Sequence, residues 1–286
     1  MTVVFDGIAS GLLLFLISVG LSVTLGLMNF VNLAHGAFAM FGGYVCVVLL
    51  NRLGVPFLAT LPIVFLASAL LGVLLERTLY RRLYGASHLD QVLFSIGLVF
   101  MSISSAHYFF GAQQQPLQLP PLLLGQFHLP GLDIGVYRLF LIVVGLAIAF
   151  ALQWMLTGTR FGAQLRAAVD NPRAARGLGI DVDRIFVLTF ALGSGLAGLG
   201  GALGAEVLGL EPTFPLKFMI YFLIVCSVGG TTTITGPLLA ALLLGIADVA
   251  GKYYVPKLGA FIVYTLMIVI LLVRPQGLFA RAGGGK

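Results

Sequence analysis

Charged residues are scarce in this chain. Only 9% of its 286 residues are Asp, Glu, Lys or Arg, whereas a soluble domain carries about a quarter. Hydrophobic residues make up 59%, so a soluble globule of this composition could not cover its own surface with polar groups. Charge-free stretches recur, and several reach the roughly 20 residues that a helix needs to cross a bilayer. The composition excludes an ordinary soluble protein and indicates an integral membrane protein.

Other residue types and patterns that the sequence lacks narrow the possible structural class of this membrane protein. The chain has two cysteines, Cys46 and Cys226, each inside an apolar run, which argues against a disulfide framework or a zinc site and favours packing roles. Alternation of apolar and polar residues with period 2, the mark of a membrane barrel, is missing. The start, MTVVFDGIASGLLLF, lacks the basic region of a secretory signal peptide, so we expect it to remain as a first helix. An all-α polytopic integral membrane protein is therefore predicted.

The charge-free segments locate the expected helices. They cover residues 7–51, 53–75, 91–111, 139–159, 185–205, 218–247 and 258–273. The first is long enough for two crossings, so we expect about eight transmembrane helices, within a range of roughly seven to nine. Broken or re-entrant segments are expected near 29–36 and 229–237, the second because the sequence GGTTTITGP opposes a regular helix. We interpret residues 1–286 as a single transmembrane domain.

The positive charges predict an orientation. Of the 16 Lys and Arg residues, eleven fall in the loops 76–90 and 158–184 or in the C-terminal tail. The other five are Arg52, Arg138, Lys217, Lys252 and Lys257. Because basic residues collect on the cytoplasmic side, we expect the N terminus outside and the C terminus in the cytoplasm. Segment 112–136 then becomes an external loop, ordered by packing on the outer face.

The stretch 159–184 predicts two short helices that form a cytoplasmic elbow. Apolar residues recur there at helical spacing: Phe161, Leu165, Ala168 and Val169. Asn171 is suited to cap a second helix, with Pro172 at its first position and Gly177 or Gly179 at its end. We interpret this elbow as a docking surface for a partner. The alternative is a solvated basic loop that only sets the topology.

Three polar residues interrupt the first apolar segment within NFVNLAHGAF: Asn29, Asn32 and His35. Polar groups at membrane depth are costly unless they face protein or water. They therefore either line a translocation pathway or satisfy the backbone carbonyls that a helix break releases. Both roles stay open at this point.

The second break, 229–237, allows the same two roles. Gly236 and Pro237 begin a half-helix whose free N–H groups would suit an anionic group such as an amino acid carboxylate. Threonine hydroxyls are available nearby, at Thr231, Thr232, Thr233 and Thr235. The alternative is a turn needed only for packing. The glycine-rich run 193–204 is expected to permit close helix packing.

Together these pieces resemble the permease subunits of ATP-binding-cassette importers of the branched-chain (hydrophobic) amino acid uptake family. The matching pieces are SVGLSVTLGLMNFVNLAHGAFAMFGGY (18–44), the elbow sequence TRFGAQLRAAVDNPRAARGLGID (159–181), GLAGLGGALGA (195–205), GGTTTITGPLLAALLLG (229–245) and RPQGLF (274–279). Each piece alone is weakly specific, but their order and spacing together extend the resemblance through nearly the whole chain.

The resemblance implies that this chain forms half of a pathway for branched-chain or related amino acids and that its elbow couples to a separate ATPase. The implied ATPase-coupling residues are Arg160, Phe161, Gly162, Arg166, Asp170, Asn171, Ala174, Ala175, Gly179 and Ile180. The expected pathway residues are Asn29, Asn32, His35, Thr231, Thr233, Thr235 and Gly236. No catalytic or metal-binding residue is expected.

The implied partners are a homologous second permease in a heterodimer, two cytoplasmic ATPase subunits and an extracytoplasmic substrate-binding protein, in a bacterial or archaeal inner membrane. The sequence holds no G-x-x-x-x-G-K-[ST] loop, so we expect no bound cofactor, ATP hydrolysis by partner subunits, and no enzymatic activity in this chain. We expect membrane lipid to surround the chain, and we do not expect nucleic acid as a partner.

Three other classes compete with this interpretation. An ion-coupled secondary transporter of small polar solutes would also use broken helices, but no carboxylate lies at the centre of a predicted span. A membrane enzyme would need a zinc motif, paired carboxylates or a supported nucleophile, and none of these patterns occurs. A purely structural membrane subunit is the third alternative. ATP-dependent uptake, as opposed to gradient-driven uptake, distinguishes the importer from the carrier.

Overall fold

A computed structural model describes residues 2–28, 30, 32–129, 132–230 and 234–274, and helices dominate this part of the chain. The elements are α1 (Thr2–Met28), α2 (His35–Asn51), α3 (Phe57–Thr78), η1 (Tyr80–Leu83), α4 (His88–Phe110), η2 (Pro121–Leu123), β1 (Gln126–Leu129), β2 (Leu132–Gly135), α5 (Val136–Gly158), α6 (Arg160–Asp170), α7 (Pro172–Gly177), α8 (Val182–Leu208), α9 (Phe214–Gly229), α10 (Thr235–Tyr254) and α11 (Gly259–Val273).

The helices confirm the predicted class of all-α polytopic membrane protein. Six of those described, α1, α3, α4, α5, α8 and α10, are long and apolar enough to cross a membrane. Three more, α2, α9 and most of α11, are apolar but shorter. The described residues thus form nine apolar helices, a number within the expected seven to nine. The two expected breaks separate α1 from α2 and α9 from α10, so two of the three short helices, α2 and α9, adjoin a break.

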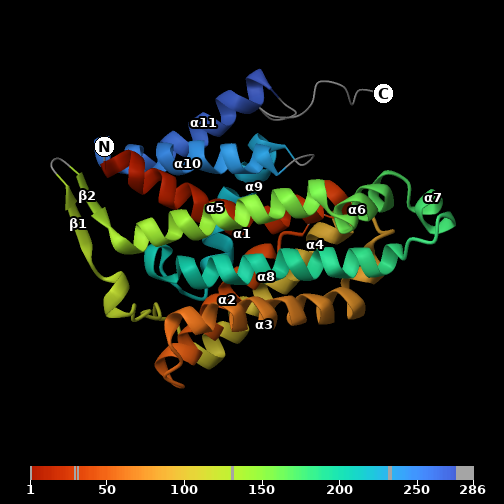
Figure 1. Cartoon of the computed structure of the whole chain (residues 1–286), viewed down its shortest axis with the longest axis horizontal. Helices are drawn as coiled ribbons and strands as arrows, with labels where there is room; N and C mark the ends of the chain where they lie inside the picture. Colours follow the sequence, from red (N-terminus) through yellow and green to blue (C-terminus); the bar gives the residue numbers. More distant parts are fainter. Residues whose placement is uncertain (1, 29, 31, 130–131, 231–233, 275–286) are drawn as a thin grey trace.

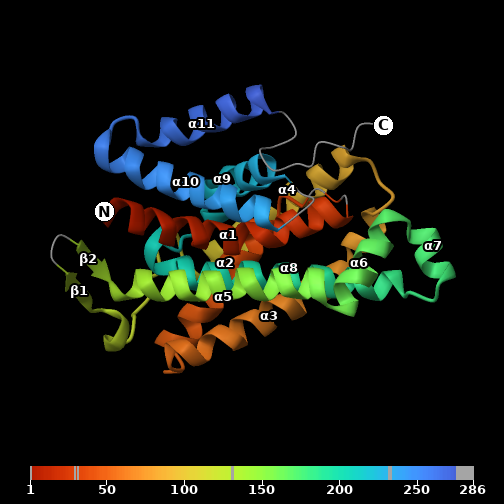
Figure 2. The same cartoon turned by 45° about the horizontal axis from the view of Figure 1, so that its top comes forward.

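Two helices form the centre of the bundle. In the most apolar 18-residue stretch of each helix, 83% of the residues of α1 and 72% of those of α8 are buried. In α3, α4 and α5 the buried share is at most 22%. Figure 1 shows the long helices lying along the longest axis of the molecule, and Figure 2 shows α9, α10 and α11 on one side of α1 with α2 and α3 on the other. Both cysteines, Cys46 and Cys226, are free and buried in this interior, as expected of packing residues.

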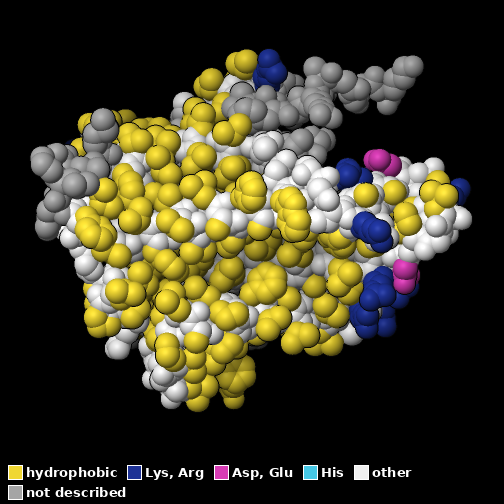
Figure 3. All heavy atoms as spheres, in the orientation of Figure 1, with side chains coloured by type: hydrophobic (Ala, Val, Ile, Leu, Met, Phe, Trp, Pro, Cys, Tyr) yellow, Lys and Arg dark blue, Asp and Glu magenta, His cyan; other side chains and the backbone are white. Residues whose placement is uncertain are grey.

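The two ends of the bundle differ. The elbow formed by α6 and α7 lies at one end, and the start of α1 lies at the other, together with β1 and β2 (Figures 1 and 2). On the face drawn in Figure 3, apolar side chains cover a broad band, while Lys and Arg side chains gather around the elbow end. Such a band is the surface that a bilayer would cover.

Glycines allow α8 to approach its neighbours closely. A Cβ atom added to Gly201 would lie 2.8 Å from Cα of Ala39 in α2 and would overlap the Ala39 carbonyl oxygen. A Cβ atom on Gly42 would likewise overlap the backbone of Gly198. Small residues at such crossings let transmembrane backbones pack together. The packing role predicted for the run 193–204 is thereby confirmed.

The segment 112–136 contains a short hairpin that the sequence did not predict. Its strands β1 and β2 pair antiparallel, with Gln126 opposite Gly135. The segment is held by packing, as expected: the N–H of Gln115 donates to the Leu210 carbonyl at 2.8 Å, and Asn51 Nδ2 donates to the Pro116 carbonyl at 3.1 Å. Strands of four residues offer too few positions for an alternating pattern to stand out.

Candidate functional site

The elbow is built from two capped helices, as predicted. The Thr159 hydroxyl accepts the N–H of Gly162 at 3.4 Å at the start of α6, and Asn171 Oδ1 accepts the N–H of Ala174 at 3.0 Å at the start of α7. Pro172 occupies the first turn of α7. Beyond this helix, Gly179 has a φ of +80°, a backbone conformation that favours glycine. The elbow is thus a defined structure rather than an irregular loop.

The apolar stripe of α6 faces the protein. Leu165 and Ala168 are buried, and they pack with Ala175 of α7 and with Val182 and Ile185 of α8. The stripe therefore anchors the elbow to the first turn of α8. Sequence periodicity identifies an apolar face but not the element that covers it.

The residues predicted to meet an ATPase fall into three groups by exposure. Six of them are exposed: Arg160, Arg166, Asp170, Asn171, Ala174 and Gly179. Phe161 and Ile180 are half-buried, whereas Gly162 and Ala175 are buried. The buried pair shapes the elbow from inside: a Cβ atom on Gly162 would lie 2.7 Å from Cα of Leu156 in α5. Arg166 also helps to fix the elbow, because its guanidinium donates to the Leu156 carbonyl.

Leu178 is a surface residue of the elbow that sequence reasoning missed. It follows α7 directly and is 81% exposed. The neighbouring Arg173 and Arg176 are exposed as well. A large exposed apolar side chain that follows two arginines in the sequence is suited to enter an apolar pocket with an acidic rim. The signal in the sequence is one large apolar residue between Gly177 and Gly179.

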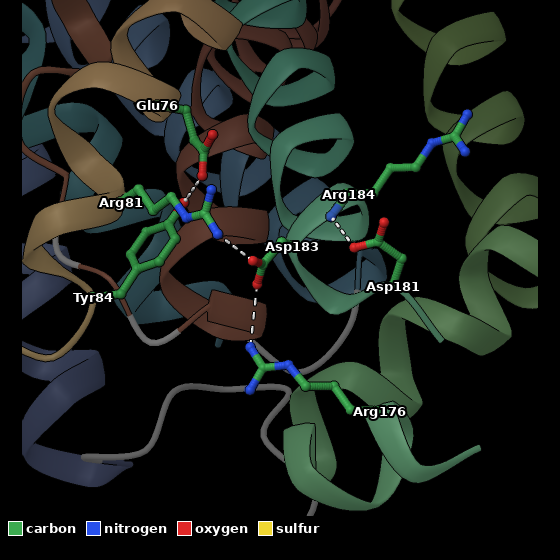
Figure 4. A network of polar contacts seen from close by, with 7 residues as sticks. All are labelled: Glu76, Arg81, Tyr84, Arg176, Asp181, Asp183 and Arg184. Atoms are coloured by element: carbon green, nitrogen blue, oxygen red, sulfur yellow. Dashed lines mark hydrogen bonds and ion pairs between the residues drawn. The ribbon is translucent and has the colours of Figure 1, made fainter. Parts of the chain in front are cut away.

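A polar network joins the elbow to the loop between α3 and α4 (Figure 4). The carboxylate of Asp183, in the first turn of α8, binds the guanidinium of Arg81 in η1. Its other oxygen accepts from Arg176 of α7 at 3.1 Å. In the same region the Tyr84 hydroxyl donates to Glu76 Oε1 at 2.7 Å. Burial and this bond to Glu76 raise the pKa of the Tyr84 phenol, so the hydroxyl stays a donor near neutral pH.

The break between α1 and α2 is buried. Asn32 Oδ1 accepts the Tyr80 hydroxyl at 2.9 Å and the N–H of Ala34 at 3.1 Å. His35 Nε2 donates to the Ile17 carbonyl at 2.8 Å. Both side chains are thus bonded within the chain, which agrees with the packing role and leaves the pathway role as a prediction. Asn29 lies outside the described residues.

The break between α9 and α10 is tight. A Cβ atom on Gly229, the last residue of α9, would lie 2.6 Å from Cα of Pro237 in the first turn of α10. Helix α10 begins at Thr235, which is exposed, and Gly236 beside it is buried. The helix is therefore broken at this place, as predicted, between α9 of 16 residues and α10 of 20 residues. Thr231, Thr232 and Thr233 lie outside the described residues.

The two breaks adjoin the same stretch of α1. His35, at the first break, bonds to Ile17, and the Cys226 thiol, near the end of α9, donates to the Ser18 carbonyl at 3.8 Å. The Ser18 hydroxyl is buried and has no partner in the described part of the chain. Two segments that are far apart in the sequence thus meet at the middle of the central helix.

A cavity of about 360 Å³ lies beside the first break, between α2, α3 and α4. Ala34, Phe38, Tyr44 and Tyr80 form part of its wall, and none of the described residues that line it is Asp, Glu, Lys or Arg. A space of this kind can hold an aliphatic side chain but offers no charged partner to an amino acid's ionised groups. Tyr80 therefore both lines the cavity and donates the hydrogen bond to Asn32.

Comparisons with known proteins agree along nearly the whole chain. The model of the family described as the permease component of the branched-chain amino acid transport system matches residues 3–271. A high-affinity branched-chain amino acid transport permease of Pseudomonas aeruginosa, BraD, is 27% identical over 96% of this chain and 94% of its own length. The probable permease LivH of Methanocaldococcus jannaschii is 28% identical over 93% of this chain and 88% of its own length.

A third relative, the permease LivH of Escherichia coli, is 27% identical over 97% of this chain and 94% of its own length. No solved structure matches the chain. The matches cover the apolar helices, both breaks and the elbow, and they favour a transport permease over an ion-coupled carrier. The chain is a multi-pass protein of the inner membrane. It belongs to the family of permease components of branched-chain amino acid transport systems.

Proposed function

We propose that this chain is the permease subunit of an ATP-driven importer and forms half of the pathway for branched-chain or related amino acids. The observation that carries the proposal is the elbow. Its two capped helices are anchored on α8, and the exposed Leu178 directly follows α7 and its two exposed arginines at one end of the bundle. An ATPase subunit that moves this elbow would move α5 and α8 with it, since the elbow connects them.

The orientation and the partners complete the proposal. Lys and Arg side chains gather at the elbow end, which favours the elbow and the C terminus in the cytoplasm and the N terminus outside. The proposed assembly holds a homologous second permease, two cytoplasmic ATPase subunits and an extracytoplasmic substrate-binding protein. The ATPase subunits hydrolyse ATP, because this sequence has no phosphate-binding loop of the Walker type and supplies no ATPase site of its own.

We place the translocation pathway along the middle of α1, where the two breaks meet. This placement is supported by the bonds of His35 and Cys226 to neighbouring carbonyls of α1 and by the exposed Thr235 at the start of α10. Asn32 and His35 then shape the break, while α10, which begins at Thr235 and Gly236, offers its N-terminal dipole to a passing carboxylate. Asn29, Thr231 and Thr233 are proposed for the same pathway from their positions in the sequence.

Replacing Leu178 with glutamate tests the docking role of the elbow. A carboxylate in place of the exposed apolar side chain should oppose an apolar pocket with an acidic rim, because like charges would meet. We expect recovery of ATPase subunits with the detergent-extracted permease to fall about tenfold or more, while the second permease stays bound. Mass spectrometry of the purified complexes measures both.

Leu122→Glu is the matched control. Leu122 is also a highly exposed leucine, at 76%, but it lies in the segment 112–136 at the end opposite the elbow. This variant should retain its ATPase subunits at the wild-type level. Equal recovery with Leu178→Glu and the wild type would contradict the proposed docking role, as would a wild-type complex that holds no ATPase after mild extraction.

A further inference from the structure

Asp183 connects two elements that approach it from different parts of the chain. Its Oδ2 binds Arg81 of η1, and its Oδ1 accepts from Arg176 of α7 at 3.1 Å (Figure 4). The three side chains are 48% to 59% exposed. Ion pairs this exposed add little to folding stability. They do fix the position of η1 relative to the tip of the elbow, since one carboxylate holds both guanidinium groups.

Tyr80, the residue of η1 that precedes Arg81, is buried instead of exposed. Tyr80 is fully buried, and its hydroxyl donates to Asn32 Oδ1 at the break between α1 and α2. Its ring meets that of Phe30 edge-on, with centroids 5.3 Å apart, and Tyr84 contacts the same Phe30 from 5.8 Å. Two consecutive residues of η1 thus have different contacts: Arg81 binds Asp183 beside the elbow, and Tyr80 bonds to Asn32 at the break between α1 and α2.

Two buried polar atoms beside this path have no partner in the described part of the chain: Asn32 Nδ2 and Glu76 Oε2. Buried polar groups in native proteins are nearly always hydrogen-bonded, and an unsatisfied one raises the free energy of the state that contains it. One atom belongs to the break, and the other belongs to the carboxylate that accepts the Tyr84 hydroxyl. A shift of η1 that gives these two atoms hydrogen-bond partners would therefore remove an unfavourable contribution to the free energy.

We propose that Arg81, Asp183 and Tyr80 form a positioning linkage that carries movement of the elbow through η1 to the break between α1 and α2. The linkage rests on the proposed function, since it requires an ATPase that moves the elbow. Its far end is also the wall of the 360 Å³ cavity, because Tyr80 lines that space. Displacement of η1 would change the break and the cavity together, so an event at the elbow would reach the pathway through η1.

Two substitutions separate this linkage from a merely structural role. Asp183→Asn removes the charge that both arginines bind, and Tyr80→Phe removes only the hydroxyl that reaches Asn32. Glu211→Gln is the matched control, because Glu211 and Lys217 form an exposed ion pair, at 2.9 Å, in the connection from α8 to the start of α9. The complete complex, with its ATPase subunits and binding protein, is reconstituted in vesicles. The measured quantity is the amount of substrate taken up per ATP hydrolysed.

Asp183→Asn should keep its ATPase subunits and their rate of hydrolysis, while uptake per ATP falls about three- to tenfold. Tyr80→Phe should lower the same ratio. The double variant should be no worse than the more impaired single variant, because both changes break one linkage. Combining Glu211→Gln with Tyr80→Phe should give the ratio of Tyr80→Phe alone.

Three results would overturn the linkage. The first is an unchanged ratio in Asp183→Asn. The second is a double variant in which the two losses multiply, as expected for independent sites. The third is loss of the ATPase subunits from Asp183→Asn, which would make Asp183 part of the docking surface instead. Failure of the proposed function would look different, since the wild-type complex would then take up substrate without ATP or would bind no ATPase.

Discussion

Gly201→Leu is expected to prevent the accumulation of folded protein. The new side chain would have to enter the backbone of α2, because even a Cβ atom at this position overlaps the Ala39 carbonyl and lies 2.8 Å from Ala39 Cα. Backbone cannot rotate away as a flexible side chain can, so we expect a cost of about 3 kcal/mol or more. That is a large part of the roughly 5–15 kcal/mol by which folded proteins are stable.

The yield of monodisperse protein in a detergent extract, followed by size-exclusion chromatography, measures this effect. Gly97→Leu is the control, because Gly97 lies on an exposed face of α4, where an added Cβ would have none of the described neighbouring residues within 4 Å. We expect a near-normal yield from Gly97→Leu and almost none from Gly201→Leu. Equal yields and equal melting temperatures would show that α2 and α8 do not pack as described.

Gly162→Val is expected to abolish transport while the membrane helices still fold. A side chain at Gly162 would collide with the backbone of Leu156 near the end of α5, so α6 would have to move away from α5. That movement would also separate Arg166 from the Leu156 carbonyl and the apolar stripe from Val182 and Ile185. An elbow displaced in this way presents Leu178 at the wrong position, and we expect ATPase recovery to fall about tenfold or more.

Gly85→Val provides the comparison for that variant. Gly85 also lies near the elbow end, in the connection from η1 to α4, but an added Cβ there has no atom within 4 Å. This variant should bind its ATPase and transport at rates close to the wild type. Normal ATPase binding by Gly162→Val would show that the packing of α6 against α5 is unimportant for docking.

Local chemistry made much of this fold predictable. The breaks at 29–36 and 229–237 follow from polar, glycine and proline residues that oppose a continuous apolar helix, and the structure places them between α1 and α2 and between α9 and α10. The caps of the elbow follow in the same way, because Asn171 and Pro172 act on backbone groups within three residues of themselves. Signals of this kind lie within one helical turn and can be read directly.

Long-range contacts were not predictable. Periodicity identified the apolar stripe that begins at Phe161, but the sequence does not say that the first turn of α8 covers it. Tyr80 lies in an arginine-rich loop, and its partner Asn32 is 48 residues away. Leu178 gave no periodic signal, since single exposed apolar residues are common on protein surfaces. Each of these features depends on how elements pack, which local patterns do not specify.

Uptake by the complete reconstituted complex tests the central claim most directly. The permease is purified from its native membrane with its co-purifying chains and binding protein and placed in sealed vesicles, and uptake of labelled leucine is measured with and without ATP. We predict uptake that requires ATP on the side of the elbow and continues when ionophores remove every ion gradient. Uptake that proceeds without ATP and stops when the gradients are removed would identify an ion-coupled carrier and contradict this account.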